Sequence, residues 1–209
     1  MHIRLATPHD LDDIADCYER ARGFMQAHGN ATQWSDGYPS RSTAERDIAV
    51  GCCYVCEGGN GVLGCLTLLD GPDPSYGSIG GGSWLNDKPY KVVHRIAARV
   101  QGTGVGGACM SWACSWGCDV RADTHEDNLP MQGLLEGLGF VRCGTVHLPD
   151  GGARLAYHWT TGDRGGDDRG SGAREDDPGL GLPIPVSVTR SEYFFGLPKA
   201  SGIRQTNTS

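Results

Sequence analysis

Residues 92–107, VVHRIAARVQGTGVGG, join an apolar stretch directly to a glycine-rich loop. The β-branched and small apolar side chains over 92–98 predict a strand. Glycine then recurs at 102, 104, 106 and 107, where a helix is expected to begin. Without side chains in the way, the backbone N–H groups of such a loop can point at an anion, and the helix dipole favours it. This stretch therefore predicts a strand–loop–helix unit that binds the pyrophosphate of a nucleotide-like cofactor.

Hydrophobic periodicity predicts a mixed sheet around this unit. Upstream, it indicates a strand over 3–5, helices over about 7–26 and 42–50, and a hairpin of strands over 53–57 and 62–70. Downstream, it indicates a helix over 106–116, a strand over 120–124, a helix over 130–138 and strands over 140–148 and 154–159. Antiparallel pairs followed by one crossover unit predict an α/β (α+β) fold, in which helices flank a mixed, mostly antiparallel central sheet.

Composition divides the chain into one folded domain and a C-terminal extension. After Thr160, residues 161–180 hold glycine, aspartate and arginine with almost nothing apolar, so this segment cannot bury enough surface to offset ordering entropy. Residues 181–209 regain apolar side chains but contain prolines and show no clear period. We therefore expect a domain over 1–160, a flexible linker over 161–180 and a partly disordered tail over 181–209.

Charge and cysteine content narrow the classes of partner. The net charge is −7, which gives no case for binding nucleic acid or an anionic membrane through bulk charge. We see no apolar run typical of a signal peptide or a membrane span, so nine cysteines indicate reduced thiols in the cytoplasm. Cys53 and Cys56 form C-x-x-C inside a strand-like run, and no second ligand pair follows at zinc-site spacing. We expect no metal.

Two cofactors are compatible with the glycine loop. Gly102, Gly104 and Gly107 satisfy the dinucleotide fingerprint G-x-G-x-x-G, and Asp123 supplies an acidic residue at the expected distance downstream. However, a dinucleotide fold usually opens the chain with this unit and continues with several parallel strands, whereas here the unit comes late. Gln101, Gly104 and Gly106 also satisfy Q/R-x-x-G-x-G/A.

With its surroundings, this second pattern resembles the GNAT superfamily of acyl-CoA-dependent N-acetyltransferases. The resemblance runs from residue 3 to residue 159 and includes the stretches GNATQW, DPSYGSI, YKVVHRIA, DTHEDNLPMQGLLEGLGF and GARLAY, which are similar to small bacterial members. It implies the GNAT fold and transfer of an acetyl group from acetyl-CoA to a primary amine, of a small molecule or peptide, by direct attack in a ternary complex. The acceptor and the oligomeric state stay open, a homodimer included.

The resemblance also assigns residues to the cofactor. The loop amides would hold the CoA pyrophosphate, the preceding strand would pair with the pantetheine arm, and an asparagine would contact the arm or sulfur side. These positions are Ile96, Ala97, Ala98, Gln101, Gly102, Thr103, Gly104, Val105, Gly106 and Asn128. The glycines could instead form a tight turn without ligand, and Asn128 is equally suited to cap the next helix. Leu135 stands where many members carry a general-acid tyrosine.

His94 is the candidate catalytic base, because it lies in the strand expected to line the cleft and a histidine suits proton transfer at neutral pH. A packing role is the alternative, and Asp123 or His125 could act through water. Arg95 should point to the other face as an ion-pair partner. Aromatic candidates for the acceptor pocket are Trp34, Tyr38, Tyr76 and Trp84. A non-catalytic acyl-CoA-binding domain and a small NAD(P)-binding domain are the alternative functions.

Overall fold

The computed structural model describes residues 1–59 and 61–162. The predicted tail over 181–209 and nearly all of the predicted linker over 161–180 lie outside the described residues, so the domain boundary near residue 160 stays a prediction.

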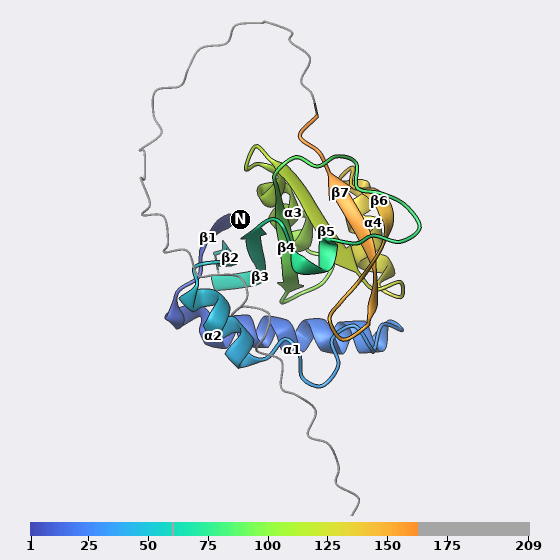
Figure 1. The fold of residues 1–209 in the computed structure, drawn as a ribbon. Helices are drawn as coiled ribbons and strands as arrows, with labels where there is room; N and C mark the ends of the chain where they lie inside the picture. Colours follow the sequence, from blue (N-terminus) through green and yellow to red (C-terminus); the bar gives the residue numbers. More distant parts are fainter. Residues whose placement is uncertain (60, 163–209) are drawn as a thin grey trace, which may run out of the picture. The chain divides into compact units, whose positions relative to one another are not determined.

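The predicted elements form with ends shifted by a few residues at most (Figure 1). The strands are β1 (His2–Leu5), β2 (Cys53–Gly58), β3 (Gly61–Asp70), β4 (Tyr90–Ala98), β5 (Asp119–Thr124), β6 (Val141–His147) and β7 (Ala153–Trp159). The helices are α1 (Leu11–Ala27), α2 (Arg41–Ala49), α3 (Val105–Cys114) and α4 (Leu129–Gly137), with short 3-10 helices η1 (Pro8–Asp10) and η2 (Pro74–Tyr76). The segment η2 lies in what the sequence predicts as a long loop.

The strands form one seven-stranded sheet in the order β1-β2-β3-β4-β5-β7-β6. Only β4 and β5 pair in parallel, and the other neighbours are antiparallel. The mixed, mostly antiparallel sheet is therefore confirmed, and a doubly wound dinucleotide-binding sheet is excluded. Strand β7 lies between β5 and β6, so the hairpin formed by β6 and β7 joins the rest of the sheet through its second strand, β7.

Helices cover both faces of the sheet. Successive strand residues alternate between two cores: Val55 packs with Ile14 and Tyr18 of α1, whereas Cys56 packs with Met110 of α3 and Leu135 of α4. Figure 1 shows α1 and α2 side by side along one side of the sheet. The loop over residues 71–89 carries Tyr76 and Trp84, which form a third small core with Val92, Val146 and Ala156.

Strands β4 and β5 diverge halfway along. Their pairing runs from Tyr90–Asp119 to Val93–Ala122 and stops there, although β4 continues to Ala98 and β5 to Thr124. At the same level the β3–β4 register shifts between Cys65 and Thr67, and Arg95 has a φ of 50°. This is a β-bulge, which bends the strand. Within the described residues no strand pairs with the β5-facing edge of β4 beyond Val93.

All nine cysteines lie in the described part of the chain and are free thiols. Among the described residues, no group of three or more histidine, cysteine or acidic side chains is arranged to hold a metal ion. None of the helices described here combines the length and apolar character needed to span a membrane.

Candidate functional site

His94 lies where β4 and β5 separate. Its Nε2 is 2.9 Å from Oδ2 of Asp73, which belongs to the loop after β3. Its Nδ1 is 3.8 Å from Oδ1 of Asp123 on β5. The Asp73 side chain is 3% exposed, the Asp123 side chain 10% and that of His94 18%. The imidazole is thus held between two nearly buried carboxylates and still reaches solvent.

Tyr76 orients the second carboxylate. Its hydroxyl donates a 2.6 Å hydrogen bond to Oδ1 of Asp123, and the ring lies beside His94 with the centroids 6.2 Å apart. Burial raises the pKa of the Tyr76 hydroxyl well above its ordinary value, with the nearby carboxylates adding to the effect. Tyr76 is therefore a permanent donor, which fixes the rotamer of Asp123 beside His94.

No sequence pattern singles out Asp73, yet the structure brings it to the site. It caps η2, because its Oδ1 accepts a 2.8 Å hydrogen bond from the backbone N–H of Ser75. Its own N–H donates to the Tyr90 hydroxyl over 3.2 Å. The Asp-Pro-Ser sequence carries a turn signal, which could have placed an oriented aspartate here but not its contact with a strand 21 residues away.

The predicted orientation of Arg95 is wrong, although its ion pair is confirmed. Nε of Arg95 lies 2.7 Å from Oδ2 of Asp47 in α2, and the Thr67 hydroxyl donates to the same oxygen. Thr67 is the cross-strand partner of His94 and shares its face of the sheet. The bulge therefore turns Arg95 to the same face as His94, where strict alternation would have placed it on the other.

The glycine loop forms an open turn at the start of α3. Gly102 and Gly104 have φ values of 75° and 81°, which favour glycine, and a Cβ at either would meet no atom closer than 4.0 Å. Residues 101–104 are exposed, and the first turn of α3, which is fully described, holds no acidic side chain. Because the first helical N–H groups have no partner inside the helix, they are available to a phosphate.

The other predicted loop residues also stabilise the turn or pack against the core. Side chains close the turn, since Gln101 donates to the Ala98 carbonyl over 3.3 Å and Thr103 to the Val100 carbonyl over 2.8 Å. Val105 is buried in the core under α3. A Cβ on Gly106 would lie 3.2 Å from Cδ2 of Leu134, so the glycine allows close packing of α3 against the Leu134 side chain of α4.

The three apolar residues before the loop alternate as a strand requires. Ile96 and Ala98 pack toward α3 and α4, and Ala97 packs toward α1. Their side chains therefore pack in the core. Their backbone N–H and C=O groups on the edge that faces the gap beside β5 are what a ligand can contact.

Asn128 caps α4, as one of its two predicted roles requires. Its Oδ1 accepts from the Met131 N–H over 3.2 Å, and its Nδ2 donates to Oε1 of Gln33 over 2.8 Å. The capping role is therefore confirmed, and contact with a cofactor stays a prediction. Leu135, at the position of the family's tyrosine, is fully buried in the core. It offers no group to a leaving thiolate.

The loop between α1 and α2 contacts the segment that joins β5 to α4. Besides the Gln33 contact, Thr32 Oγ1 lies 3.4 Å from Nε2 of His125. Among the aromatic candidates, the indole N–H of Trp84 donates to the Tyr76 carbonyl, and Trp34 packs edge-on against Tyr18. Tyr38 is partly exposed, and its hydroxyl accepts from Arg95 over 3.1 Å. Trp34 and Trp84 thus have packing contacts, Tyr38 pairs with Arg95, and contact of any of them with an acceptor stays a prediction.

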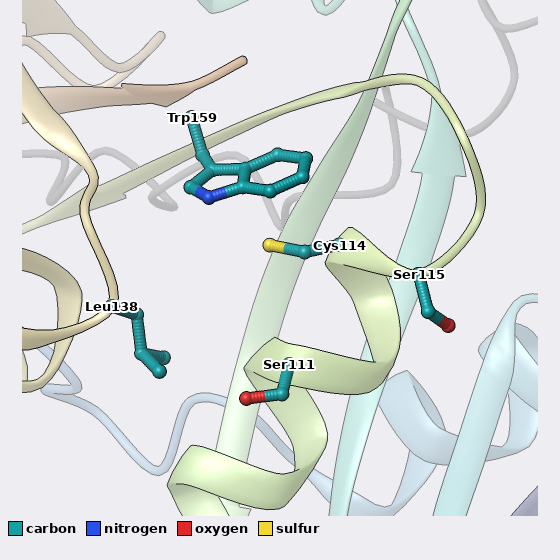
Figure 2. A pocket seen from close by; sticks show the side chains of 5 residues that line it. All are labelled: Ser111, Cys114, Ser115, Leu138 and Trp159. Atoms are coloured by element: carbon teal, nitrogen blue, oxygen red, sulfur yellow. The ribbon is translucent and has the colours of Figure 1, made fainter. Parts of the chain in front are cut away.

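A separate pocket of about 340 Å³ lies at the C-terminal end of α3. Its lining residues are Ser111, Cys114, Ser115, Leu138 and Trp159. Figure 2 shows the Cys114 thiol pointing toward the Trp159 indole. None of these residues belongs to the predicted site, so the site at His94 remains the candidate for chemistry.

Comparison with known proteins supplies the family. No protein-family model and no curated protein matches the sequence. Among solved structures, a GNAT-family acetyltransferase from Streptococcus agalactiae 2603 is 34% identical with a TM-score of 0.71, and the match covers 77% of this chain and 95% of that one.

Two more distant structures share the fold. A ribosomal-protein-alanine N-acetyltransferase from Brucella melitensis is 17% identical with a TM-score of 0.52, over 77% of this chain and 99% of that one. A GNAT-like decarboxylase in complex with isobutyryl-CoA is 16% identical with a TM-score of 0.51, over the same shares of both chains. The 34% identity over nearly the whole streptococcal protein shows that the chain belongs to the GNAT family of acetyltransferases.

Proposed function

We propose that the protein is an N-acetyltransferase that moves an acetyl group from acetyl-CoA to a primary amine by direct attack in a ternary complex. The observation that carries the proposal is the position of His94. It lies at the point where β4 and β5 separate, and it is hydrogen-bonded to one buried carboxylate and adjacent to a second. A histidine oriented by a carboxylate is the arrangement expected of a general base.

The described residues fit an acyl-CoA as the donor substrate. The open turn with left-handed Gly102 and Gly104 leaves room for a pyrophosphate at the positive end of α3. The unpaired edge of residues 96–98 offers backbone groups to an extended amide-bearing arm. GNAT-like relatives include a protein solved with isobutyryl-CoA, which supports this choice of donor.

The chemistry needs a neutral amine. At neutral pH the acceptor arrives as an ammonium ion, for which the Asp123 carboxylate is a suitable partner. Nδ1 of His94, 3.8 Å from that carboxylate, then accepts the ammonium proton. The amine nitrogen attacks the thioester carbonyl, a C–N bond forms, and the C–S bond breaks as thiolate leaves. The nitrogen loses a second proton, which water passes to the thiolate, so that the amide and the free thiol are the products. A strand N–H at the β4 edge can stabilise the oxyanion.

A non-catalytic acyl-CoA-binding domain is the alternative. It is suggested by Leu135, which cannot protonate the thiolate. The oriented His94 favours the enzyme, because a domain that only binds acyl-CoA has no use for a base between two carboxylates.

Thiol release from acetyl-CoA tests the proposal. The full chain is incubated with acetyl-CoA and a panel of amines, including polyamines, aminoglycosides and peptides with free N-termini, and free thiol is measured with a disulfide dye. We expect amine-dependent thiol release, with an acetylated product of the matching mass. Thermal stabilisation by acetyl-CoA without release for any amine would favour the binding domain, and stabilisation by NADH but not acetyl-CoA would contradict the donor.

A further inference from the structure

We propose that Asp73 is a positioning residue that holds the proton of neutral His94 on Nε2. Nδ1 is then left unprotonated and serves as the base atom that faces Asp123. The tautomer follows from the geometry alone. The statement that Nδ1 takes the proton of the acceptor amine rests on the proposed function.

The surroundings of Asp73 make it a fixed acceptor. Its side chain is 3% exposed, its Oδ1 accepts from the Ser75 N–H, and its Oδ2 faces Nε2 of His94 at 2.9 Å. An ionised carboxylate can only accept hydrogen bonds, so the proton between Asp73 and His94 belongs on Nε2. The bond from the Asp73 N–H to the Tyr90 hydroxyl ties the same residue to the first residue of β4. The acceptor and the imidazole are thus held by one strand.

The opposite ring nitrogen has different neighbours. Asp123 Oδ1 lies 3.8 Å from Nδ1, beyond a direct hydrogen bond, and that oxygen already accepts from Tyr76. No other residue in the described part of the chain is hydrogen-bonded to Nδ1. A nitrogen that lies to one side of the line from Nδ1 to Oδ1 of Asp123 can therefore contact both atoms, which is the geometry needed to pass one proton from a bound cation to the imidazole.

The wrong tautomer would remove the base. With the proton on Nδ1, the ring would donate toward the acceptor, and its lone pair would point at the Asp73 carboxylate. Replacing Asp73 with asparagine keeps the shape but allows the amide to donate to Nε2, which favours that wrong tautomer. A carboxylate-to-amide change behind a catalytic histidine lowers turnover through the tautomer while the geometry is kept.

Nitrogen NMR of the full chain with ¹⁵N-labelled histidine tests the tautomer directly. The His94 signals are assigned by their loss in His94→Gln, at a pH where the ring is neutral. We expect the Nε2–H form in the native protein, a shift toward Nδ1–H in Asp73→Asn, and no change in Asp70→Asn, which removes an exposed carboxylate at the end of β3. The Nδ1–H form in the native protein would overturn the proposal, and this measurement holds even if Asp73→Asn fails to fold.

Kinetics separate this proposal from the function on which part of it rests. With an amine substrate in hand, Asp73→Asn should lower kcat by about 100-fold or more while KM for acetyl-CoA stays within about twofold. An unchanged kcat would overturn the role of Asp73. If no amine is acetylated, the proposed function fails, but the NMR result still decides the tautomer.

Discussion

His94 and its two carboxylates come from three separate parts of the chain. Asp73 lies in a loop, His94 on β4 and Asp123 on β5. Each carboxylate has its own supporting donor, which is the Ser75 N–H for Asp73 and the Tyr76 hydroxyl for Asp123. Such second contacts fix the rotamers of groups that must act in one geometry.

His94→Gln is expected to lower kcat/KM by about 10²–10⁴, because the amide cannot accept the amine proton, while the affinity for acetyl-CoA stays unchanged. Thiol-release kinetics and calorimetric titration measure the two quantities. His147→Gln, at an exposed position on β6, is the matched control and should keep native turnover. Native turnover in His94→Gln itself would remove His94 as the base.

The sequence patterns point to His94 as a candidate but not to its partner Asp73. His94 could be chosen because a strand that feeds a glycine loop lines the cleft in this family. Asp73 could not be chosen, because no local sequence pattern indicates that this turn residue contacts β4, which follows 21 residues later at His94. Asn128 shows the opposite case, in which a local capping pattern was sufficient to predict one role correctly.

At the level of elements, the strand β4 and the turn after it carry the site. The bulge at Arg95 places two consecutive side chains on one face, and the left-handed glycines open the start of α3. Periodicity predicts where strands and helices lie, because it follows from local side-chain patterns. It does not predict a bulge, which inserts one residue into the alternation, nor the pairing of β5 with β7, which depends on long-range contacts.

Gly104→Ala tests the open turn. A side chain at φ 81° costs about 1–2 kcal/mol in the left-handed region, so we expect reduced stability and weaker acetyl-CoA binding. Chemical denaturation and calorimetric titration report the two effects. Gly133→Ala in α4 is the matched control: its Cβ meets no atom within 4 Å, and it should stabilise the helix by about 0.5–1 kcal/mol. Equal binding in both variants would argue against a phosphate at the turn.

Asp10→Asn tests the junction of β1 and α1. The Arg4 guanidinium, 2.8 Å from both carboxylate oxygens, holds the pKa of Asp10 well below its ordinary value. A lowered folded-state pKa gives stability that is present above the unfolded value and is lost as the pH falls through the folded one. We expect the variant to lose about 1–2 kcal/mol near neutral pH.

Urea unfolding at neutral pH and below about pH 4 checks the direction of this pH dependence. The difference in free energy of unfolding between native protein and variant should become smaller on acidification. Asp12→Asn removes an exposed carboxylate paired with Arg41 and should change little at either pH. A difference for Asp10→Asn that grows in acid would contradict the assignment.

For the whole molecule, the match to the streptococcal acetyltransferase covers 95% of that protein but 77% of this chain. The composition change after Thr160 predicts a domain boundary there. Fold class and family were accessible from sequence because the strand, loop and asparagine occur in one order. The acceptor was not, because its pocket depends on how segments far apart in the sequence meet around His94.

A chain ended after Gly162 should fold and bind acetyl-CoA with the affinity of the full-length protein, because all three described cores and the glycine loop lie before that residue. Thermal unfolding and calorimetric titration of the two chains make the comparison. A lower melting temperature or weaker binding in the shortened chain would show that residues 163–209 contribute to the domain.

The divergence of β4 from β5 has a mechanical consequence. Within the described residues, two antiparallel half-sheets, β1–β4 on one side and β5, β7 and β6 on the other, are joined by four β4–β5 residue pairs at one end of these two strands. An acyl-CoA arm bound in the gap beyond Val93 and Ala122 would contact both half-sheets and add to the few interactions that join them. Acetyl-CoA should therefore slow hydrogen exchange most at β4 and β5 amides beside the gap, and hardly at all in the β1–β2 pair at the far edge.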